Sequence, residues 1–422
     1  MSKINIPKLR FKEFSGEWED KNYGDIYSFY STNSLSRDKL NYKDGEVYNI
    51  HYGDIHTKFS TMFKLENEYV PFINNEIDLS KIKEENYCQI GDLVIADASE
   101  DYEDIGKTIE IISLNKKRIL AGLHTFLARP NKEYISLGFI AYLLQNYHIK
   151  KQIMKIAQGT KVLSLSTKRL SNVKLNLPQK QEQQKIASFL TTVDKKIEQL
   201  TKKAELQEQY KKGVMGKIFK QEIRFKNDDG SEFEEWKEKK LKELAIRSTT
   251  KNKDSSINNV LTNSATFGII NQTDYFDKGI ANQNNLEGYY VVKTNDFIYN
   301  PRISNHAPVG PMKRNKLSVG IMSPLYTVFR FKKINLDFIE YYFNSPLWHK
   351  YMYHIANYGA RHDRMNITNN DFLKMPINIP QKQEQTKIAN FLSLLDKKID
   401  STKEQLSKTK EFKKGLLQNM FV

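Results

Sequence analysis

Arginine, asparagine, lysine and histidine side chains gather in a segment rich in proline and glycine, residues 299–316 (YNPRISNHAPVGPMKRNK). The candidates within it are Asn300, Arg302, Asn305, His306 and Lys313. Such side chains form hydrogen bonds to the edges of nucleic-acid bases, often two at once, and a loop can carry them into a groove. We predict that this segment contacts DNA, with a solvated surface loop as the alternative.

The same chemistry recurs elsewhere in weaker form. Residues 357–366 (NYGARHDRMN) form a second cluster beside Gly359, and the first half of the chain offers scattered lysines and one arginine. Any one of them could equally be a solvated surface charge, but as groups we predict that they face DNA. These further candidates are Arg361, His362 and Arg364 in the second cluster, and Lys58, Lys161, Lys168 and Arg169 in the first half.

Motifs for catalysis and metal binding are missing. The acidic stretch 97–104 (DASEDYED) lacks the spacing of a calcium-binding loop. Carboxylates can also accept hydrogen bonds from the amines of cytosine, but for this stretch we predict a solvated loop. No glycine-rich phosphate loop of the ATPase form is present. The nearest stretch to an adenine-methyltransferase motif, Asn300-Pro301-Arg302, lacks its second proline and its aromatic residue. We predict no catalytic residue and no metal site.

Charge and composition narrow the partners. The net charge is +16, and much of the excess lies in residues 178–220, with ten lysines against five acids, and in residues 378–422, with nine against five. Such a balance favours a polyanionic partner, although solvated lysine-rich helices would give the same count. No apolar stretch could span a bilayer, no secretion signal opens the sequence, and Cys88 is the only cysteine. We expect a cytoplasmic protein.

The chain contains an internal repeat. Residues 178–197 (PQKQEQQKIASFLTTVDKKI) and 380–399 (PQKQEQTKIANFLSLLDKKI) share fifteen of twenty positions. The segments between the copies diverge but keep a skeleton, such as Gly91-Asp92-Leu93 against Asn295-Asp296-Phe297. Repetition of this kind indicates one structural unit used twice, with a shared part for a common task and divergent parts for related targets.

The two repeated segments predict long helices. Apolar residues follow a heptad seam from Ile186 to Ala204, which becomes polar at Gln207 and Lys211 and then resumes. The second copy shows the same seam from Ile388, and Phe189 and Phe391 widen the stripe. We predict that the helices pair as an antiparallel coiled coil that acts as a spacer. The alternatives are packing of each helix on its own domain, or homodimerisation.

These patterns predict an α+β fold with a pseudo-two-fold internal repeat, in which the two long helices join and space two mixed α/β domains. The boundaries are 1–177 and 221–377 for the domains, and 178–220 and 378–422 for the helical regions. Strand-like runs include EVYNI, DLVIA and TIEIIS in the first domain and GYYVV, DFIY and YTVFRF in the second. Amphipathic helix patterns cover about 137–156 and 336–355. Neither domain shows the continuous apolar runs with βαβ spacing that are typical of a doubly wound parallel sheet, so we do not expect one.

At the repeated segments the sequence resembles the specificity subunits of Type I restriction–modification systems, over essentially the whole chain. Members of that family open each long helix with Pro-x-x-x-Glu-Gln-x-x-Ile, which here begins at Pro178 and at Pro380. The resemblance implies a non-catalytic reader of double-stranded DNA, in which each variable domain recognises one half of a bipartite asymmetric site and the helices set the spacer. It also implies contacts with partner subunits, which we assign to Glu182, Gln183, Ile186, Phe189, Glu384, Gln385, Ile388 and Phe391.

The implied partners are two modification subunits, which carry S-adenosylmethionine and methylate adenine, and restriction subunits, which use ATP and Mg²⁺. No cofactor is expected in this chain. The family's base contacts vary freely, so the DNA-facing residues above are inferred from loop chemistry alone. The alternative from another functional class is a duplicated adaptor that assembles a complex without reading bases.

Overall fold

The computed structural model describes residues 5–275, 286–357 and 363–422. The chain divides into two compact units: unit 1 comprises Met1–Thr201 with Glu404–Val422, and unit 2 comprises Lys202–Lys403. Each unit therefore includes part of both long helices, α6 (Lys180–Phe219) and α12 (Lys382–Asn419), a division that the predicted boundaries did not foresee.

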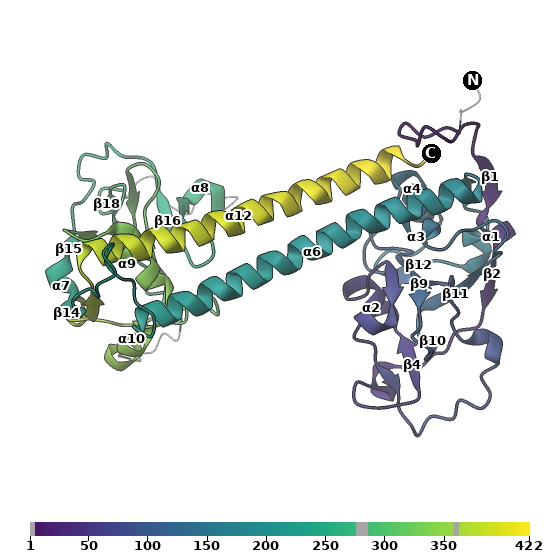
Figure 1. Ribbon diagram of the computed structural model, residues 1–422, viewed down its shortest axis with the longest axis horizontal. Coiled ribbons are helices and arrows are strands. Elements are labelled where there is room, and N and C mark those ends of the chain that lie inside the picture. Colours follow the sequence, from purple (N-terminus) through teal and green to yellow (C-terminus); the bar gives the residue numbers. More distant parts are fainter. Residues whose placement is uncertain (1–4, 276–285, 358–362) are drawn as a thin grey trace. The chain divides into compact units, whose positions relative to one another are not determined.

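Unit 1 is built on a five-stranded sheet in the order β2-β11-β7-β9-β5, in which only β5 and β9 run parallel. A smaller sheet in the order β10-β4-β6-β3 lies beyond it, and β1 pairs with β13 and β8 with β12. The strands are β1 (Glu19–Asn22), β2 (Tyr27–Tyr30), β3 (Leu40–Asn41), β4 (Val47–Ile50), β5 (Met62–Lys64), β6 (Phe72–Ile73), β7 (Leu93–Ala96), β8 (Ala98–Ser99), β9 (Thr108–Ser113), β10 (Arg118–Ala121), β11 (Thr125–Pro130), β12 (Leu163–Ser164) and β13 (Lys174–Leu177). The shorter helices are α1 (Tyr23–Ile26), α2 (Tyr52–Thr57), α3 (Phe139–Leu143), α4 (Tyr147–Ile156) and α5 (Thr167–Leu170) (Figure 1).

Unit 2 is built on a four-stranded antiparallel sheet in the order β15-β22-β19-β20. Three further pairs join β16 with β17, β18 with β21, and β14 with β23. The strands are β14 (Lys237–Lys240), β15 (Ala245–Ser248), β16 (Leu261–Ser264), β17 (Gly268–Asn271), β18 (Tyr290–Val292), β19 (Phe297–Tyr299), β20 (Met312–Arg314), β21 (Gly320–Met322), β22 (Thr327–Phe331) and β23 (Pro376–Ile379). The shorter helices are α7 (Leu241–Leu244), α8 (Gln272–Tyr275), α9 (Leu336–Asn344), α10 (His349–Ile355) and α11 (Asn369–Leu373).

The repeat predicted from the sequence is confirmed by matching sheets. Strands β2, β11, β7 and β9 of unit 1 have the same order as β15, β22, β19 and β20 of unit 2. A bidentate ion pair recurs at the same place: Arg129 binds the buried carboxylate of Asp92, and Arg330 binds that of Asp296. Because a buried charge needs a partner, each pair fixes the start of its central strand against the neighbouring strand.

The predicted strand-like runs all contain strands, but each predicted amphipathic helix is two helices. In unit 1 the break falls at Asn146, whose side chain accepts a hydrogen bond from the His148 backbone and caps α4. In unit 2 it falls at Ser345 and Pro346, since proline disfavours a helical conformation in the residue before it. The periodicity continues across both breaks and therefore could not reveal them.

The long helices make antiparallel contacts within each unit. In unit 1, Lys413 of α12 binds Asp194 of α6, with 2.6 Å between Nζ and Oδ1. In unit 2, Lys211 binds Asp396, and Lys403 binds Glu208 with 2.5 Å between Nζ and Oε1. The polar gap in the seam at Lys211 is thus occupied by an ion pair, while Ile186 and its heptad neighbours enter the apolar core. We predict that α6 and α12 pair along their whole length as one coiled coil, and this stays a prediction.

Aromatic residues at the ends of these helices complete the two cores. Phe219, the last residue of α6, contacts the rings of Trp236 and Phe338 in unit 2. Phe421, just after α12, contacts the ring of Trp18 in unit 1, with 6.2 Å between ring centres. Phe219 and Phe421 are separated by 202 positions, the same offset as the two repeated segments, so equivalent residues of the repeat share this packing role.

Candidate nucleic-acid interface

Two predicted DNA-facing segments meet in unit 2. The backbone N–H of Ile303 donates to the carbonyl of Asp363 (3.0 Å), and that of Met365 donates to the carbonyl of Pro301 (2.9 Å). These bonds form an antiparallel bridge between Arg302 and Arg364. Residues from the two clusters, about sixty positions apart in the sequence, are thereby placed side by side.

The bridge forms one wall of a polar hollow with a volume of about 410 Å³. Its lining combines hydroxyl, amide and guanidinium groups with the exposed side chain of Leu325 and the ring of Tyr326. Groups of these types can donate to and accept from base edges in a groove. The polar lining residues are Thr262, Asn263, Ser264, Gln272, Asn300, Arg302, Ser304, Ser323, Tyr326 and Arg364.

The two arginines share a single carboxylate. Arg302 Nε and Arg364 Nε both lie 3.6 Å from Asp363 Oδ2, and the side chain of Arg302 is 63% exposed. One acid cannot neutralise two guanidinium groups, so the bridge keeps a net positive charge at the surface. Guanidinium donors in this position can bind phosphate oxygens or the two acceptors of guanine.

Asn263 of β16 holds the hollow together, and sequence analysis did not identify it. Its buried Nδ2 donates to the carbonyls of Ile298 and Pro311, and its own carbonyl accepts from Asn300 Nδ2 at 3.0 Å. The turn opposite requires Gly310, which has φ of +80° and whose Cβ, if present, would stand 2.1 Å from the Asn300 carbonyl oxygen. A lone asparagine in a strand gave no signal from which this role could be found.

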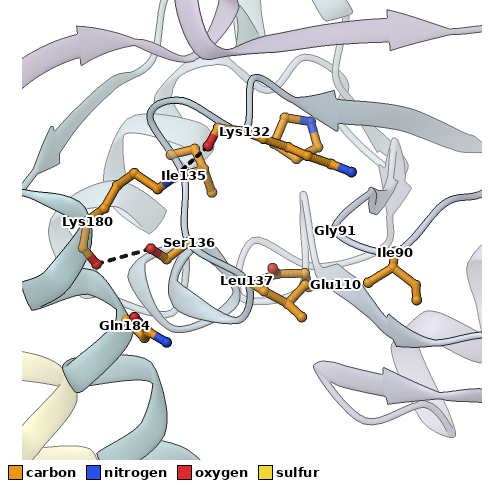
Figure 2. Close-up of a pocket in the computed structure, with 10 residues that line it drawn as sticks. Ile90, Gly91, Glu110, Lys132, Ile135, Ser136, Leu137, Lys180 and Gln184 are labelled. Atoms are coloured by element: carbon orange, nitrogen blue, oxygen red, sulfur yellow. Dashed lines mark hydrogen bonds between the residues drawn. The ribbon is translucent and has the colours of Figure 1, made fainter.

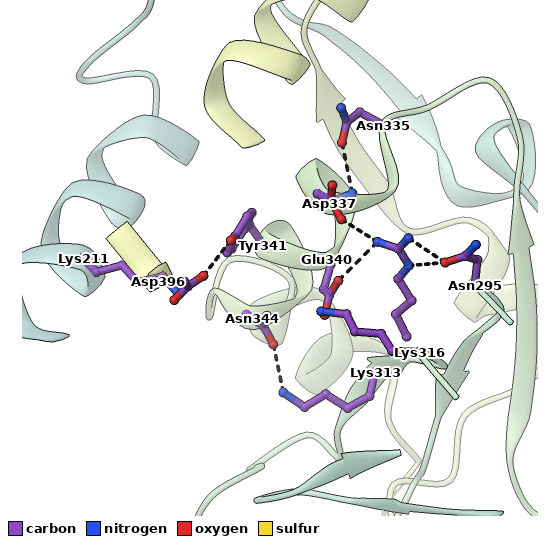
Figure 3. Close-up of polar contacts among 11 residues, drawn as sticks. Lys211, Asn295, Lys313, Lys316, Asn335, Asp337, Glu340, Tyr341, Asn344 and Asp396 are labelled. Atoms are coloured by element: carbon purple, nitrogen blue, oxygen red, sulfur yellow. Dashed lines mark hydrogen bonds and ion pairs between the residues drawn. The ribbon is translucent and has the colours of Figure 1, made fainter. Parts of the chain in front are cut away.

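The other candidates of unit 2 have different positions. Asn305 and His306 are exposed on the turn after the bridge, next to the hollow. Lys313 is not among the residues of the hollow: its Nζ donates to Asn344 Oδ1 at 2.9 Å, and burial lowers its pKa (Figure 3). Arg361 and His362 lie outside the described residues.

The candidates of unit 1 are spread apart. Lys161 and Lys168 are exposed, whereas Arg169 donates to the Ile156 carbonyl and to Gln158 Oε1, which secures the end of α4. Lys58 is half exposed, and its Nζ lies 2.9 Å from the fully buried carboxylate of Asp54. The structure does not gather these four into one site.

Comparison with known proteins identifies the family. The model of the Type I restriction modification DNA specificity domain matches the chain twice, over residues 12–208 and 233–411. This chain belongs to that family. It is accordingly the DNA-recognition subunit of a Type I restriction–modification system, with two recognition domains and a non-catalytic part in the complex.

Individual relatives agree with this family over most or nearly all of the chain. The specificity subunit is 27% identical to the putative type I restriction enzyme MjaX specificity subunit of Methanocaldococcus jannaschii, over 96% of this chain and 94% of the relative. The MjaVIII specificity subunit of the same organism is also 27% identical, over 71% and 73%. The solved S subunit of a Type I restriction–modification system from M. genitalium has the same fold, with a TM-score of 0.56, 12% identity and 99% coverage of both chains.

The specificity subunit uses its signature glutamates inside each unit. Glu182 is 0% exposed and binds Arg10, with 2.7 Å between Oε2 and Nη2. Glu384 is equally buried, binds Arg224 and accepts from the indole N–H of Trp236. Each glutamate therefore ties the first turn of a long helix to the segment that precedes the domain's first strand.

The neighbouring signature residues are also internal. Gln183 accepts from the Ser136 backbone and Gln385 accepts from the Asn335 backbone, while Ile186 and Ile388 are buried in the two cores. The resemblance to the family predicts that all of these residues contact partner subunits. That assignment stays a prediction, but burial leaves only Phe189 and Phe391 with side-chain surface through which such a contact could form.

A second hollow, of about 410 Å³, lies at the start of α6 in unit 1 (Figure 2). At its base is Glu110 of β9, whose carboxylate accepts from the backbone N–H groups of Gly138 (2.6 Å) and Ala141 (3.1 Å). Burial raises the pKa of Glu110 to about 7. Because its oxygens are occupied by the start of α3, this acid supports the fold rather than a ligand.

Within the described residues we find no cluster of three or more His, Cys, Asp or Glu side chains suited to a metal ion. In the same residues no helix is long and apolar enough to cross a membrane.

Proposed function

We propose that each unit of this specificity subunit reads one half of a bipartite, asymmetric DNA site. The observation that carries the proposal is the pair of equivalent bridges in the two units. Where unit 2 places Arg302 and Arg364, the bridge between β8 and β12 in unit 1 places Ala98 and Ser164. The same backbone thus presents different chemistry, as reading two unlike half-sites requires.

We further propose that the long helices set the unread spacer and recruit two modification subunits. Those subunits would supply S-adenosylmethionine, and restriction subunits would supply ATP and Mg²⁺; we place no cofactor on this chain. Support comes from the two copies of the family domain and from the fold shared with a structure that addresses complex assembly of the type I system, with a TM-score of 0.52 and 13% identity over 95% of this chain.

Long-read methylation mapping tests the proposal. The chain is co-expressed with the modification subunit from the same genome, and we expect a single bipartite adenine-methylation motif that is lost when the chain is omitted. Exchanging residues 221–376 for those of another family member should then change only one half of that motif.

A change in both halves would contradict the assignment of one half-site to each unit. A stable complex that methylates no defined motif would favour the adaptor that does not read bases. The control is an exchange of the same residues between two members with identical motifs, which should leave the methylation pattern as it was.

A further inference from the structure

The two units can be compared position by position around the bridge. In unit 2 the N–H of Met365 donates to the carbonyl of Pro301, and in unit 1 the N–H of Leu165 donates to the carbonyl of Asp97 (2.8 Å). Asp97 therefore occupies the place of Pro301, which lines the hollow of unit 2. A carboxylate replaces a side chain that can neither donate nor accept.

The strand register extends the match to the facing strand. In unit 1, Ala96 lies opposite Thr125, so that Asp97 and His124 follow as the next residues outward. In unit 2, Tyr299 lies opposite Thr327, and Pro301 and Leu325 follow two residues further outward on the two strands. Because Asp92 and Asp296 occupy the same position in the two units, Pro301 corresponds to Asp97 and Leu325 to His124. Leu325 also lines the hollow. The two wall positions filled by proline and leucine in unit 2 are thus filled by aspartate and histidine in unit 1.

Asp97 and His124 form a pair at the surface. His124 Nδ1 lies 3.3 Å from Asp97 Oδ1, and the Asp97 N–H donates to the His124 carbonyl. Their side chains are 23% and 52% exposed, and the ring of Tyr52 packs edge-on against the imidazole with 5.3 Å between centres. Partial burial raises the pKa of Asp97. The backbone of His124 has φ of +56°, a conformation uncommon outside glycine, asparagine, aspartate and histidine.

We propose that Asp97, positioned by His124, reads an amino-bearing base of the first half-site, with the N4 amine of cytosine as its ligand. The proposal rests on the proposed function of unit 1 as a reader. An ionised carboxylate only accepts hydrogen bonds, whereas the guanidinium groups at the bridge of unit 2 only donate them. The site in unit 1 therefore selects hydrogen-bond donors on the bases, and the site in unit 2 selects hydrogen-bond acceptors.

The surroundings of Asp97 favour a base over a phosphate. The following loop carries the carboxylates of Glu100, Asp101 and Glu103, which repel the DNA backbone, while Asp104 is paired with Lys107. A contact made here must consequently be with a donor group, and in the major groove the donors are the amines of cytosine and adenine. Aspartate and glutamate pair in this way with cytosine N4.

The test replaces Asp97 by asparagine in the complex with its modification subunits. Asp97→Asn adds a donor beside the acceptor, the pattern that pairs with adenine N6 and N7. We expect preference at one base pair of the first half-site to fall by roughly tenfold to a hundredfold and to shift towards adenine. The second half-site should be unchanged. Asp101→Asn, in the adjacent exposed turn, is the matched control and should leave the motif intact.

An unchanged first half-site in Asp97→Asn, or an equal loss at every site with both halves intact, would overturn this inference. Should that variant fail to fold, His124→Gln decides: a loss confined to the same half-site supports the pair, and an unchanged motif rejects it. If the wild-type complex gives no bipartite motif at all, the proposed function itself fails, which is a separate outcome.

Discussion

Unit 1 and unit 2 keep the same buried contacts while their exposed bridges differ. The pair of Asp92 with Arg129 recurs as Asp296 with Arg330, and the glutamate at the start of each long helix binds an arginine in both. The bridge instead changes from small side chains in unit 1 to two arginines in unit 2. The buried contacts that stabilise the fold are the same in both units, whereas the exposed residues at the bridge differ between them.

One internal contact joins the equivalent strand and helix in both units but uses different chemistry. In unit 1, Glu110 of β9 accepts from the backbone of Gly138 at the start of α3. In unit 2, the equivalent strand β20 carries Arg314, which binds the carboxylates of Asp337 and Glu340 on α9 (Figure 3). In unit 1 an acid on the strand accepts from the first backbone N–H groups of the helix, and in unit 2 a base on the strand binds acidic side chains of the helix. Both units keep a polar contact between the strand and the helix, but the strand contributes an acid in unit 1 and a base in unit 2.

The strongest test of this likeness is to remove the charge from each signature glutamate. Glu182→Gln and Glu384→Gln each remove the buried carboxylate that an arginine of the same unit binds. The free energy of opening should fall by about 3 kcal/mol in unit 1 and by less in unit 2, where Arg224 keeps its ion pair with Glu235. Native-state hydrogen exchange on the full chain measures each unit separately. Glu198→Gln, on the exposed face of α6, is the control. A large effect in one unit with none in the other would break the comparison.

This difference predicts that only unit 1 changes its stability with pH through the contact between strand and helix. The pKa of Glu110 rises from 4.5 to about 7 on folding, so the folded unit holds its proton more tightly than the unfolded chain. This stabilisation is complete below pH 4.5 and is lost as the pH rises through 7, a change of roughly 3 kcal/mol.

Glu110→Gln should abolish that part of the pH dependence, measured as the difference in hydrogen exchange of unit 1 between pH 5 and pH 8. The matched variant in unit 2, Arg314→Gln, should add no pH dependence, because arginine stays charged throughout. If the stability of unit 1 falls between pH 5 and pH 8 by as much in Glu110→Gln as in the wild type, the assignment to Glu110 is contradicted.

The smallest effect that we expect is a loss of recognition at one half-site, which distinguishes the bridge of unit 2 from that of unit 1. Arg302→Gln and Arg364→Gln should each relax recognition of the second half-site by roughly tenfold to a hundredfold, because each removes a guanidinium donor from the hollow. Methylation mapping of the complex measures this. Lys313→Gln, outside the hollow, should leave the motif unchanged. Relaxation of the first half-site by either arginine variant would refute the division of labour.

The sequence allowed the repeat, the strand-like runs and the extents of the long helices to be predicted, because these depend on local periodicity and on direct identity between copies. It could not show the burial of Glu182, since its partner Arg10 lies 172 positions earlier. The bridge between Arg302 and Arg364 was likewise hidden, although both residues were named from their side-chain chemistry. Asn263, Asp97 and His124 acquire their places from strand register, which single residues do not reveal.

The packing of Phe421 against Trp18 affects how the chain is made. Unit 2 is one continuous stretch, Lys202–Lys403, whereas unit 1 needs Glu404–Val422 to complete its core. A ribosome delivers the second unit whole before it delivers the last helical turns of the first. The unit translated first is therefore the last that can finish folding, and its open apolar core must await the arrival of its own distant end.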